Sequence, residues 1–390
     1  MGIADIQRAL REEKLDGWLF FDHHERDPIA YRVLGFRPPA VPTRRWYYFV
    51  PAGGEPRALL HRVEPGMLDA LPGVRTCYSS WVEQEAGLRS LLGDARRVAM
   101  QYSPKCAVPY VAMVDAGTVE LVRGLGVEVV TSADLVQLFE ARWSESQIDS
   151  HLEAGRRVDE IRRAAFEKIG DRLRRGVPVN EFQIRQFIRG AFEQAGLVTD
   201  HGPIVAVNAN ASNPHYEPTE EVRAEIRPGD WVLIDLWAKL DQPEAVYYDI
   251  TWTGYCGTDV PETMRKVFEV VRQARDLAVA RVREAIAAGE RLRGCDVDDA
   301  ARRHIRDQGY GAFFFHRTGH SIGREVHGAG ANMDNLESHD ERRILAGTCF
   351  SIEPGIYLPE FGVRSEVNVL VGEREARVTG DVQTAPVHIG

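Results

Sequence analysis

Four carboxylate side chains lie within or beside apolar runs in the second half of the chain. Asp235 is in WVLIDLWA, Asp249 in VYYDITWTG, Glu353 in CFSIEPGIY and Glu366 in GVRSEVNVLV. A charge that is buried without a partner costs several kcal/mol or is neutralised by protonation. Any one of these carboxylates could pair with an arginine, but the apolar runs hold too few lysines and arginines for all four. The pattern therefore predicts a strongly positive partner.

Histidines gather in the same half of the chain. His316, His320 and His327 fall within the segment HRTGHSIGREVHG, and His215 is separate, in NPHYEP. A spacing of four between His316 and His320 fits one face of a helix. Because three glycines interrupt the segment, we expect an irregular or extended backbone instead. Three ordinary surface histidines remain an alternative for this segment taken alone.

Carboxylates and imidazoles together are the ligand types of divalent metal ions. Two cations that share Asp, Glu and His ligands would neutralise the buried carboxylates. Two metals about 3.5–4 Å apart can activate a bridging water and polarise a carbonyl group. The residue types therefore predict a dinuclear metal site that carries out hydrolysis.

The elements that position these residues follow from hydrophobic periodicity. Residues 145–175 have apolar positions at three- and four-residue spacing, which predicts a long helix that ends before Pro178. A second long helix is expected after Pro261. Apolar runs predict strands over 231–236, 348–352 and 366–371.

The first third of the chain has a different pattern. A helix is expected over residues 4–14, followed by short strand candidates that alternate with helical stretches: 17–21, 46–50, 98–100 and 127–130. Such alternation is typical of an α/β layer with a parallel or mixed sheet. We therefore predict two domains, an α/β domain over 1–144 and a larger α+β domain over 145–390.

Composition limits the class of protein. The chain has 390 residues, 44% of them hydrophobic and 27% charged, with a formal net charge of −10. These values exclude a disordered chain and a collagen-like fibre. An acidic balance does not favour a nucleic-acid partner, and no apolar run is long enough to suggest a membrane span. Five scattered cysteines without a Cys-x-x-Cys pair indicate a cytoplasmic protein.

The ordered carboxylate and histidine set resembles the five metal ligands of the pita-bread metallopeptidases, family M24, which includes methionine aminopeptidase, aminopeptidase P and prolidase. The matching residues are Asp235, Asp249, His320, Glu353 and Glu366. The N-terminal segment LDGWLFFD is similar to the creatinase-type domain of prolidases and aminopeptidases P. The resemblance implies an α+β protein: a C-terminal pita-bread catalytic domain behind a smaller N-terminal α/β creatinase-type domain.

The resemblance also implies a role for each ligand. Asp235 would chelate one metal with both oxygens, and Asp249 and Glu366 would bridge the two metals. His320 would complete the first metal and Glu353 would bind the second. Oxygen-rich ligands with one imidazole suit Mn²⁺, although Co²⁺ or Zn²⁺ could also bind. No organic cofactor is expected.

Further residues match positions that act on the substrate in this family. Glu353 would also carry the proton of the bridging water. His215, His316 and His327 would contact the substrate and the developing oxyanion, and Arg364 would orient the ligands.

The function implied by the resemblance is metal-dependent hydrolysis of the Xaa-Pro bond of dipeptides, as in a prolidase (Xaa-Pro dipeptidase). An aminopeptidase P, which removes the first residue of longer Xaa-Pro peptides, is the alternative. A metal-free creatinase-like enzyme or a non-catalytic binding protein is more remote, because all five ligand types are kept. The expected partners are small proline-containing peptides and a second copy of the chain.

The chain departs from the family at two places. The stretch between Asp235 and Asp249 is a few residues longer than in typical members, and the extra residues within KLDQPEAV predict a longer hairpin beside the site. Trp252 stands where the family often has an arginine. Both departures bear on substrate choice more than on metal binding.

Overall fold

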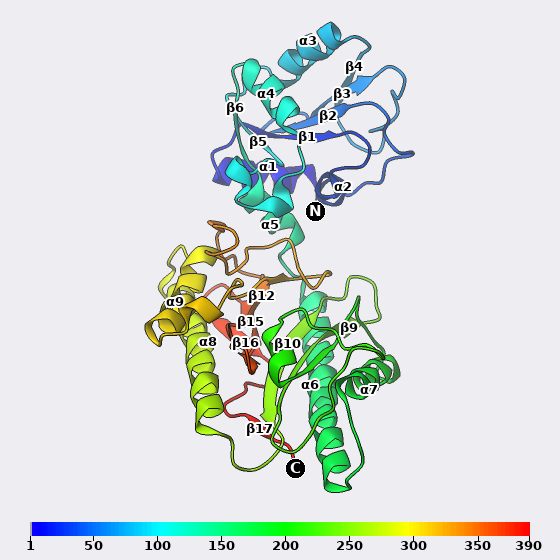
Figure 1. The fold of residues 1–390 in the computed structure, drawn as a ribbon. Coiled ribbons are helices and arrows are strands. Elements are labelled where there is room, and N and C mark those ends of the chain that lie inside the picture. The colour runs from blue at the N-terminus through cyan, green and yellow to red at the C-terminus, as the bar shows by residue number, and fades with distance from the viewer. Residues whose placement is uncertain (1) are drawn as a thin grey trace. The chain divides into compact units, whose positions relative to one another are not determined.

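The protein is described here from a computed structural model, which describes residues 2–390. The chain divides into two compact units: unit 1 ends at Glu140, and unit 2 runs from Ala141 to Gly390. Figure 1 shows the elements of each unit. Within the described residues, no helix combines the length and apolar character needed to cross a membrane.

Unit 1 is built on one six-stranded mixed sheet with the strand order β4-β3-β2-β1-β5-β6. β1 pairs antiparallel with β2 and parallel with β5, so the expectation of a mixed sheet is confirmed. Each short strand predicted in this region falls on an observed one. The strands are β1 Gly17–Asp22, β2 Trp46–Pro51, β3 Arg57–His61, β4 Val74–Tyr78, β5 Arg97–Met100 and β6 Glu128–Thr131.

Helices cover this sheet, and local capping sets where they begin. Ser80 caps α3 by accepting a hydrogen bond from the backbone of Glu83, and Asp115 caps α4 in the same way through Thr118. Apolar residues of α3 and α4 pack with those of the strands into one core. The helices are α1 Ile3–Glu12, α2 Pro28–Leu34, α3 Trp81–Leu92, α4 Ala116–Gly124 and α5 Ala133–Glu140, with 3₁₀ turns at Pro104–Cys106 (η1) and Pro109–Val111 (η2).

The first half of unit 2 packs two helices on a five-stranded sheet. α6 begins at the N-cap Ser144, whose side chain forms a capping box with Gln147. The apolar stripe of α6, predicted from its spacing, lies in a core with α7 and the sheet. The elements are α6 Glu145–Arg174, α7 Glu181–Gln194, β7 Leu197–Val198, β8 Ile204–Val207, η3 Asn208–Ser212, β9 Trp231–Leu240, β10 Tyr248–Tyr255 and the late strand β17 Val387–His388.

The second half of unit 2 repeats the arrangement with another helix pair. α8 and α9 pack against a four-stranded sheet, β11-β12-β15-β16, in a separate core. In Figure 1 the strands of both halves lie between α6 and α7 on one side and α8 and α9 on the other. The elements are α8 Glu262–Ala288, α9 Gly294–Asp307, η4 Gly311–Phe313, β11 Ser321–Ile322, β12 Cys349–Ile352, β13 Gly355–Tyr357, β14 Gly362–Arg364, β15 Val367–Val371 and β16 Ala376–Thr379.

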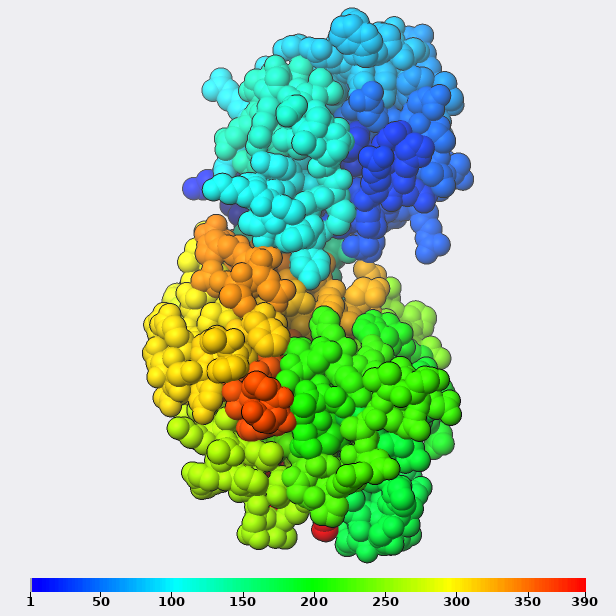
Figure 2. All heavy atoms as spheres, in the orientation of Figure 1, coloured from blue at the N-terminus to red at the C-terminus, as the bar shows by residue number. Residues whose placement is uncertain are grey.

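A short hairpin connects the two halves of unit 2. β13 and β14 pair antiparallel, and the hydroxyl of Ser212, after β8, donates a hydrogen bond to the carbonyl of Leu358 at the hairpin tip. Figure 2 shows the hairpin in red between green and yellow segments on the visible face of unit 2. The two halves of unit 2 are therefore linked at the surface as well as through their sheets.

Candidate metal centre and active site

The β9–β10 ladder presents two of the predicted ligands on one face. Asp235 lies opposite Thr251, and Asp249 lies opposite Trp237. Residues two apart on a strand, and residues directly opposite across a ladder, project to the same face of the sheet. Both aspartates are buried and therefore point into the same space from neighbouring strands.

The second half of unit 2 brings the glutamates to these aspartates. The backbone N–H of Glu366 donates to the carbonyl of Thr251 at 3.1 Å, and Asn368 Nδ2 donates to the carbonyl of Asp249 at 2.7 Å. The N–H of Glu353 donates to the carbonyl of Thr318 at 2.7 Å. These bonds attach β15 and β12 to the neighbouring segments, so the glutamate side chains reach the aspartates.

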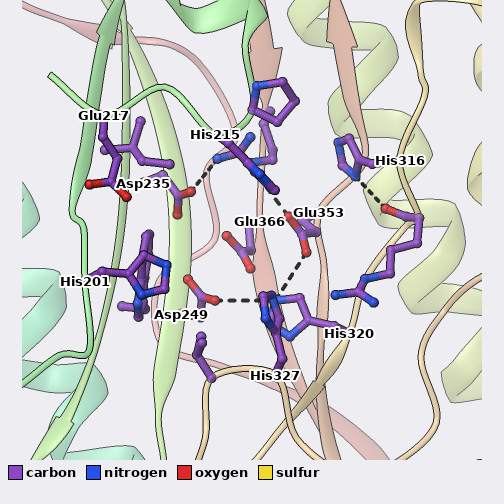
Figure 3. Close-up of a pocket in the computed structure, with 16 residues that line it drawn as sticks. His201, His215, Glu217, Asp235, Asp249, His316, His320, His327, Glu353 and Glu366 are labelled. Atoms are coloured by element: carbon purple, nitrogen blue, oxygen red, sulfur yellow. Dashed lines mark hydrogen bonds and ion pairs between the residues drawn. The ribbon is translucent and has the colours of Figure 1, made fainter. Parts of the chain in front are cut away.

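His320 enters from the glycine-rich segment, which is extended as expected. Its N–H donates to Ser351 Oγ at 2.9 Å, and β11 begins at the next residue. His320 Nε2 lies 3.6 Å from Asp249 Oδ2 and 3.4 Å from Glu353 Oε1. Figure 3 shows the ring pointing at both carboxylates.

The donor set fits divalent cations. One ligand atom from each of Asp249, His320 and Glu366 lies within 4.8 Å of the others. Asp249 Oδ1 and Glu366 Oε1 are buried and have no hydrogen-bond partner. Buried polar atoms are nearly always paired, and a hard cation pairs with such oxygens. Asp235 lies in the same cavity but outside this close trio.

Electrostatics also favour a positive partner. Burial raises the pKa of Asp249 to about 7, and burial together with the charge of Asp249 raises the pKa of Glu366 well above its usual range. Burial also raises the pKa of Asp235, although the positive charge of Arg364 opposes this. A group that resists ionisation in this way is stabilised as the anion when a cation binds beside it.

Glu353 differs from the other carboxylates. Burial acts to raise its pKa, but the nearby positive charges of His320 and Arg364 outweigh burial and lower it. For His320, the hydrogen bond and charges of the neighbouring carboxylates outweigh burial and raise the pKa. Glu353 is therefore the carboxylate most readily ionised in the cavity.

Arg364 and Tyr357 form a buried chain beside the ligands. Arg364 donates Nη2–H to Asp235, Nε–H to Thr251 Oγ1 at 3.0 Å and Nη1–H to the Tyr357 hydroxyl oxygen at 3.1 Å. Tyr357 in turn lies 2.7 Å from His316 Nε2. A hydrogen-bonded path thus runs from Asp235 to His316. The sequence reasoning missed Tyr357, although it lies four residues after Glu353.

His316 and His327 are held as neutral rings. Burial lowers the pKa of His316 to about 4 and that of His327 to about 3. The His327 ring packs edge-on against His320, with 4.4 Å between centroids. A neutral imidazole can donate from one nitrogen and accept at the other, which suits contact with a polar substrate.

Asp298 on α9 fixes the segment that carries these histidines. This buried carboxylate accepts hydrogen bonds from the Thr318 N–H at 2.9 Å and the Thr318 hydroxyl at 2.7 Å. It also forms a two-point ion pair with Arg302, which donates to the carbonyl of His316 at 2.8 Å. The helix therefore determines where both His316 and His320 lie.

Glu181 on α7 fixes the loop that carries His215. It is fully buried and accepts hydrogen bonds from the N–H of Val207 at 2.7 Å, the Tyr216 hydroxyl at 2.6 Å and the N–H of Ala224 at 2.6 Å. Asn210 donates to it as well, at 2.9 Å. One carboxylate is thus hydrogen-bonded to both ends and to the middle of the loop, residues 207–224.

All nine predicted site residues line one cavity of about 250 Å³. They are Asp235, Asp249, His320, Glu353, Glu366, His215, His316, His327 and Arg364, and Figure 3 labels the first eight. The sequence reasoning missed other wall residues: His201, Ile204, Pro214, Glu217, Trp237, Arg317 and Val326. Trp237 lies two positions after Asp235 and shares its face, but the predicted strand 231–236 ends one residue before it, whereas β9 continues to Leu240.

The hairpin between β9 and β10, expected to be longer than in related proteins, forms part of the surroundings of this site. Residues 241–247 connect β9 to β10, and the segment after His320 is bound to it. Lys239 Nζ donates to the carbonyl of Arg324 at 2.6 Å, Glu244 pairs with the Arg324 side chain, and the Tyr247 N–H donates to the carbonyl of Gly323 at 2.9 Å. The extra residues therefore support the segment between His320 and His327.

Trp252 lies on the other face of β10. It is opposite Ile234, one position out of phase with the ligands. The Arg162 guanidinium of α6 lies 3.5 Å from the centre of its ring, a cation–π arrangement. Trp252 therefore packs against α6 and does not face the candidate metal ligands.

Unit 2 thus has the features of a hydrolase with a buried metal centre, and comparison with known proteins agrees. The model of metallopeptidase family M24 matches residues 152–373, more than half of the chain. The protein therefore belongs to metallopeptidase family M24. The helix pairs around central strands are the pita-bread fold of that family.

Individual relatives are similar over part of their length. The chain is 31% identical over 224 residues to an Xaa-Pro dipeptidase of Lactobacillus delbrueckii subsp. lactis, covering 57% of this chain and 55% of the relative. It is 29% identical over 240 residues to a putative Xaa-Pro aminopeptidase of Mycoplasma genitalium, covering 59% and 61%. The matches thus span about half the length of such relatives.

The fold is similar to that of the dipeptidase PepE of Mycobacterium ulcerans, with a TM-score of 0.67 and 24% sequence identity. The match covers 99% of this chain and 96% of that structure.

Proposed function

We propose that this protein hydrolyses the Xaa-Pro bond of dipeptides with two divalent metal ions, most naturally Mn²⁺. The observation that carries the proposal is the buried carboxylate and imidazole set in which two oxygens, on Asp249 and Glu366, have no partner. The similarity to an Xaa-Pro dipeptidase supports the substrate class.

The five residues that would hold the metals are Asp235, Asp249, His320, Glu353 and Glu366. When bound there, the two cations lower the pKa of a water molecule and polarise the scissile carbonyl. Arg364 keeps one oxygen of Asp235 in place, and Thr251 donates to Glu366 Oε2 at 2.9 Å. These contacts fix the ligand geometry before substrate binds.

Glu353 is the proton carrier in this proposal. Because its pKa is lowered, it is ionised near neutral pH and can accept a proton from the attacking water. The same carboxyl can then donate that proton to the departing nitrogen of proline. Water is the nucleophile in this proposal, because the lining residues of the cavity include no serine or cysteine. An amide carbonyl is a poor electrophile, so this water must be activated.

The neutral histidines orient the substrate. His316 donates its Nδ1–H to the carbonyl of Arg317 at 2.7 Å and accepts from the Tyr357 hydroxyl at Nε2, so its ring is fixed beside Glu353 as part of the cavity wall. An Xaa-Pro bond has no amide hydrogen and carries a rigid ring. The wall formed by Ile204, Trp237 and Val326 is apolar and suits a pyrrolidine ring.

An assay of proline release tests this proposal. Metal-free protein supplemented with Mn²⁺ should release proline from Ala-Pro and Leu-Pro, and Co²⁺ or Zn²⁺ should be compared. Absence of proline release with each of these metals would overturn the proposal. If activity persists after complete metal removal, a creatinase-like reaction is favoured instead.

An aminopeptidase P activity is the second candidate, supported by the similarity to a putative Xaa-Pro aminopeptidase. Comparing a dipeptide with an Xaa-Pro-Pro tripeptide separates the two, since an aminopeptidase P prefers the longer chain. We further propose that the protein is a cytoplasmic homodimer, which light scattering and cell fractionation would test.

A further inference from the structure

Unit 1 contains a separate cavity of about 630 Å³ that shares no lining residue with the metal centre. Its walls come from the end of β1, the loops around β2, the end of β4 and the starts of α3 and α4. Pockets of about 300–1,000 Å³ are typical of sites for small organic ligands. The family model that defines the peptidase begins at residue 152 and does not include this region.

The charge of this cavity is opposite to that of the protein. Arg26, Arg44 and Arg45 line it, whereas Asp115 is its one acidic residue, in a chain of net charge −10. Both oxygens of Asp115 are engaged by Thr118, through its N–H at 2.9 Å and its hydroxyl at 2.8 Å. Asp115 is therefore occupied as a helix cap, and the guanidinium charge is left in excess.

Two of the guanidinium groups are available to a ligand. Within residues 2–390, the side chains of Arg26 and Arg45 make no hydrogen bond or ion pair. Arg44 donates only to its neighbour Thr43, at 3.0 and 3.2 Å. Arg26 and Arg45 both line the cavity and both are exposed. Both guanidinium groups are therefore open to a ligand that enters it.

An exposed indole lies at the rim of the same cavity. Trp81 is the first residue of α3 and is 73% exposed, which is unusual for the largest apolar side chain. The nearby Tyr78 is buried, and its hydroxyl donates to the carbonyl of Arg45 at 2.8 Å, so the backbone at Arg45 is fixed to this wall of the cavity. Gly117 and Thr118, in the first turn of α4, complete this side of the cavity.

We propose that this cavity binds a nucleoside phosphate, with the phosphate between Arg26 and Arg45 and the base stacked on Trp81. Planar guanidinium groups suit phosphate oxygens because they donate two parallel N–H bonds. An open indole face binds a flat heteroaromatic ring by stacking. The cavity thus offers arginines for the phosphate and an indole ring for the base.

Binding of AMP to the full-length protein tests the proposal. Titration should quench Trp81 fluorescence and release heat, and AMP should bind more tightly than either inorganic phosphate or adenosine alone. Arg26→Gln and Arg45→Gln should each weaken AMP binding by about tenfold or more. Trp81→Ala should weaken it by about tenfold, whereas Trp81→Phe should keep the affinity and lose the fluorescence change.

Two controls separate this site from other anion binding. Arg37→Gln removes an exposed arginine of unit 1 that does not line the cavity, and should leave AMP affinity unchanged. Asp249→Asn disables the metal centre and should also leave it unchanged. The proposal is overturned if AMP does not bind, if AMP binds no better than phosphate, or if Asp249→Asn abolishes binding while Arg26→Gln does not. Peptidase activity should be normal in the unit 1 variants, so this test does not depend on the proposed function.

Discussion

At the scale of single residues, the unpartnered oxygens of Asp249 and Glu366 affect the stability of the protein without metal. Two carboxyl groups that face each other in a buried cavity repel when both are ionised. A bound cation removes this repulsion. Metal binding should therefore stabilise the fold as well as permit catalysis.

Glu366→Gln is expected to separate these two effects. Because the amide keeps the shape of the side chain and replaces a carboxyl group that burial already keeps from ionising, the metal-free variant should be at least as stable as the metal-free native protein. Adding Mn²⁺ should raise the melting temperature of the native protein but not of the variant, whose peptidase activity should be lost. Calorimetry and metal analysis check this, with the exposed Glu375→Gln as control. A variant that still binds two metals and cleaves Ala-Pro would contradict the ligand assignment.

Tyr357→Phe tests the hydrogen-bonded path from Asp235 to His316. Loss of the hydroxyl removes a partner from both His316 and Arg364 while the ring remains in the core. We expect kcat to fall about 10- to 100-fold, as for other groups that orient metal ligands, with little change in KM. Steady-state kinetics on Leu-Pro measure both constants. Tyr255→Phe is the matched control, and an unchanged kcat for Tyr357→Phe would exclude a role for this path.

At the scale of secondary-structure elements, the site depends on helices that contribute no ligand. Asp298 on α9 fixes the histidine segment, and Glu181 on α7 fixes the loop of His215. Each is a buried carboxylate whose oxygens accept backbone hydrogen bonds from a loop. The loops are irregular, so these helices define their conformation.

Glu181→Gln should loosen the His215 loop. The amide keeps one acceptor oxygen but turns an NH₂ group toward donors, so at least one buried N–H loses its partner. We expect a loss of about 2–4 kcal/mol in the free energy of unfolding, and faster proteolysis within residues 208–224. Urea unfolding and limited proteolysis measure these effects. Glu193→Gln, exposed on the same helix, should be neutral, and equal protease resistance in both variants would contradict the role of Glu181.

The elements also show what the sequence could predict. The stripes of α6 and α8 run over many turns, so their periodicity was clear, and the apolar runs of β9, β12 and β15 were equally visible. α7 and α9 are about half as long as α6 and α8. Their buried faces also include charged residues, such as Glu181 and Asp298, that hold loops in place. These charges interrupt the apolar pattern that would predict a helix. The predicted domain limit of 144/145 and the observed limit between the two units at 140/141 lie close together.

The predicted site residues lie together, whereas most of the cavity walls were not predicted. The family resemblance supplied the ligand order, and all nine residues share the cavity. Tyr357 and His201 were missed because their neighbours are distant in sequence: Tyr357 reaches the site through the β13–β14 pairing, and the His201 ring packs edge-on against Trp237 at 5.2 Å. Such contacts follow from tertiary packing, which no local pattern encodes.

At the scale of the whole molecule, buried histidines make the fold sensitive to acid. His151 of α6 is fully buried between the carbonyl of Tyr247 at 2.7 Å and Thr379 Oγ1 at 2.8 Å, so it joins elements of both halves of unit 2. Burial lowers its pKa from 6.5 to about 4. The unfolded chain therefore binds a proton that the folded chain does not between these pH values.

The stability of the metal-free protein should consequently fall as the pH drops from 6.5 toward 4. His151 alone would contribute about 3 kcal/mol to this loss. His151→Asn should be less stable at pH 7.5, because it loses packing, yet its stability should decline less steeply below pH 6.5. Urea unfolding in EDTA across this pH range gives the slopes. Parallel slopes for the two proteins would show that His151 is not a source of the acid sensitivity.

The hairpin between β9 and β10 is also a place where the substrate range of such an enzyme can change during evolution. The ladder register fixes Asp235 and Asp249, while residues 241–247 lie beyond the last paired positions and are bound to the segment ahead of His327. Insertions there can reshape the substrate wall and leave the ladder intact. Natural selection can therefore alter the range of peptides through the length of one turn, while the chemistry of the metal centre is inherited unchanged.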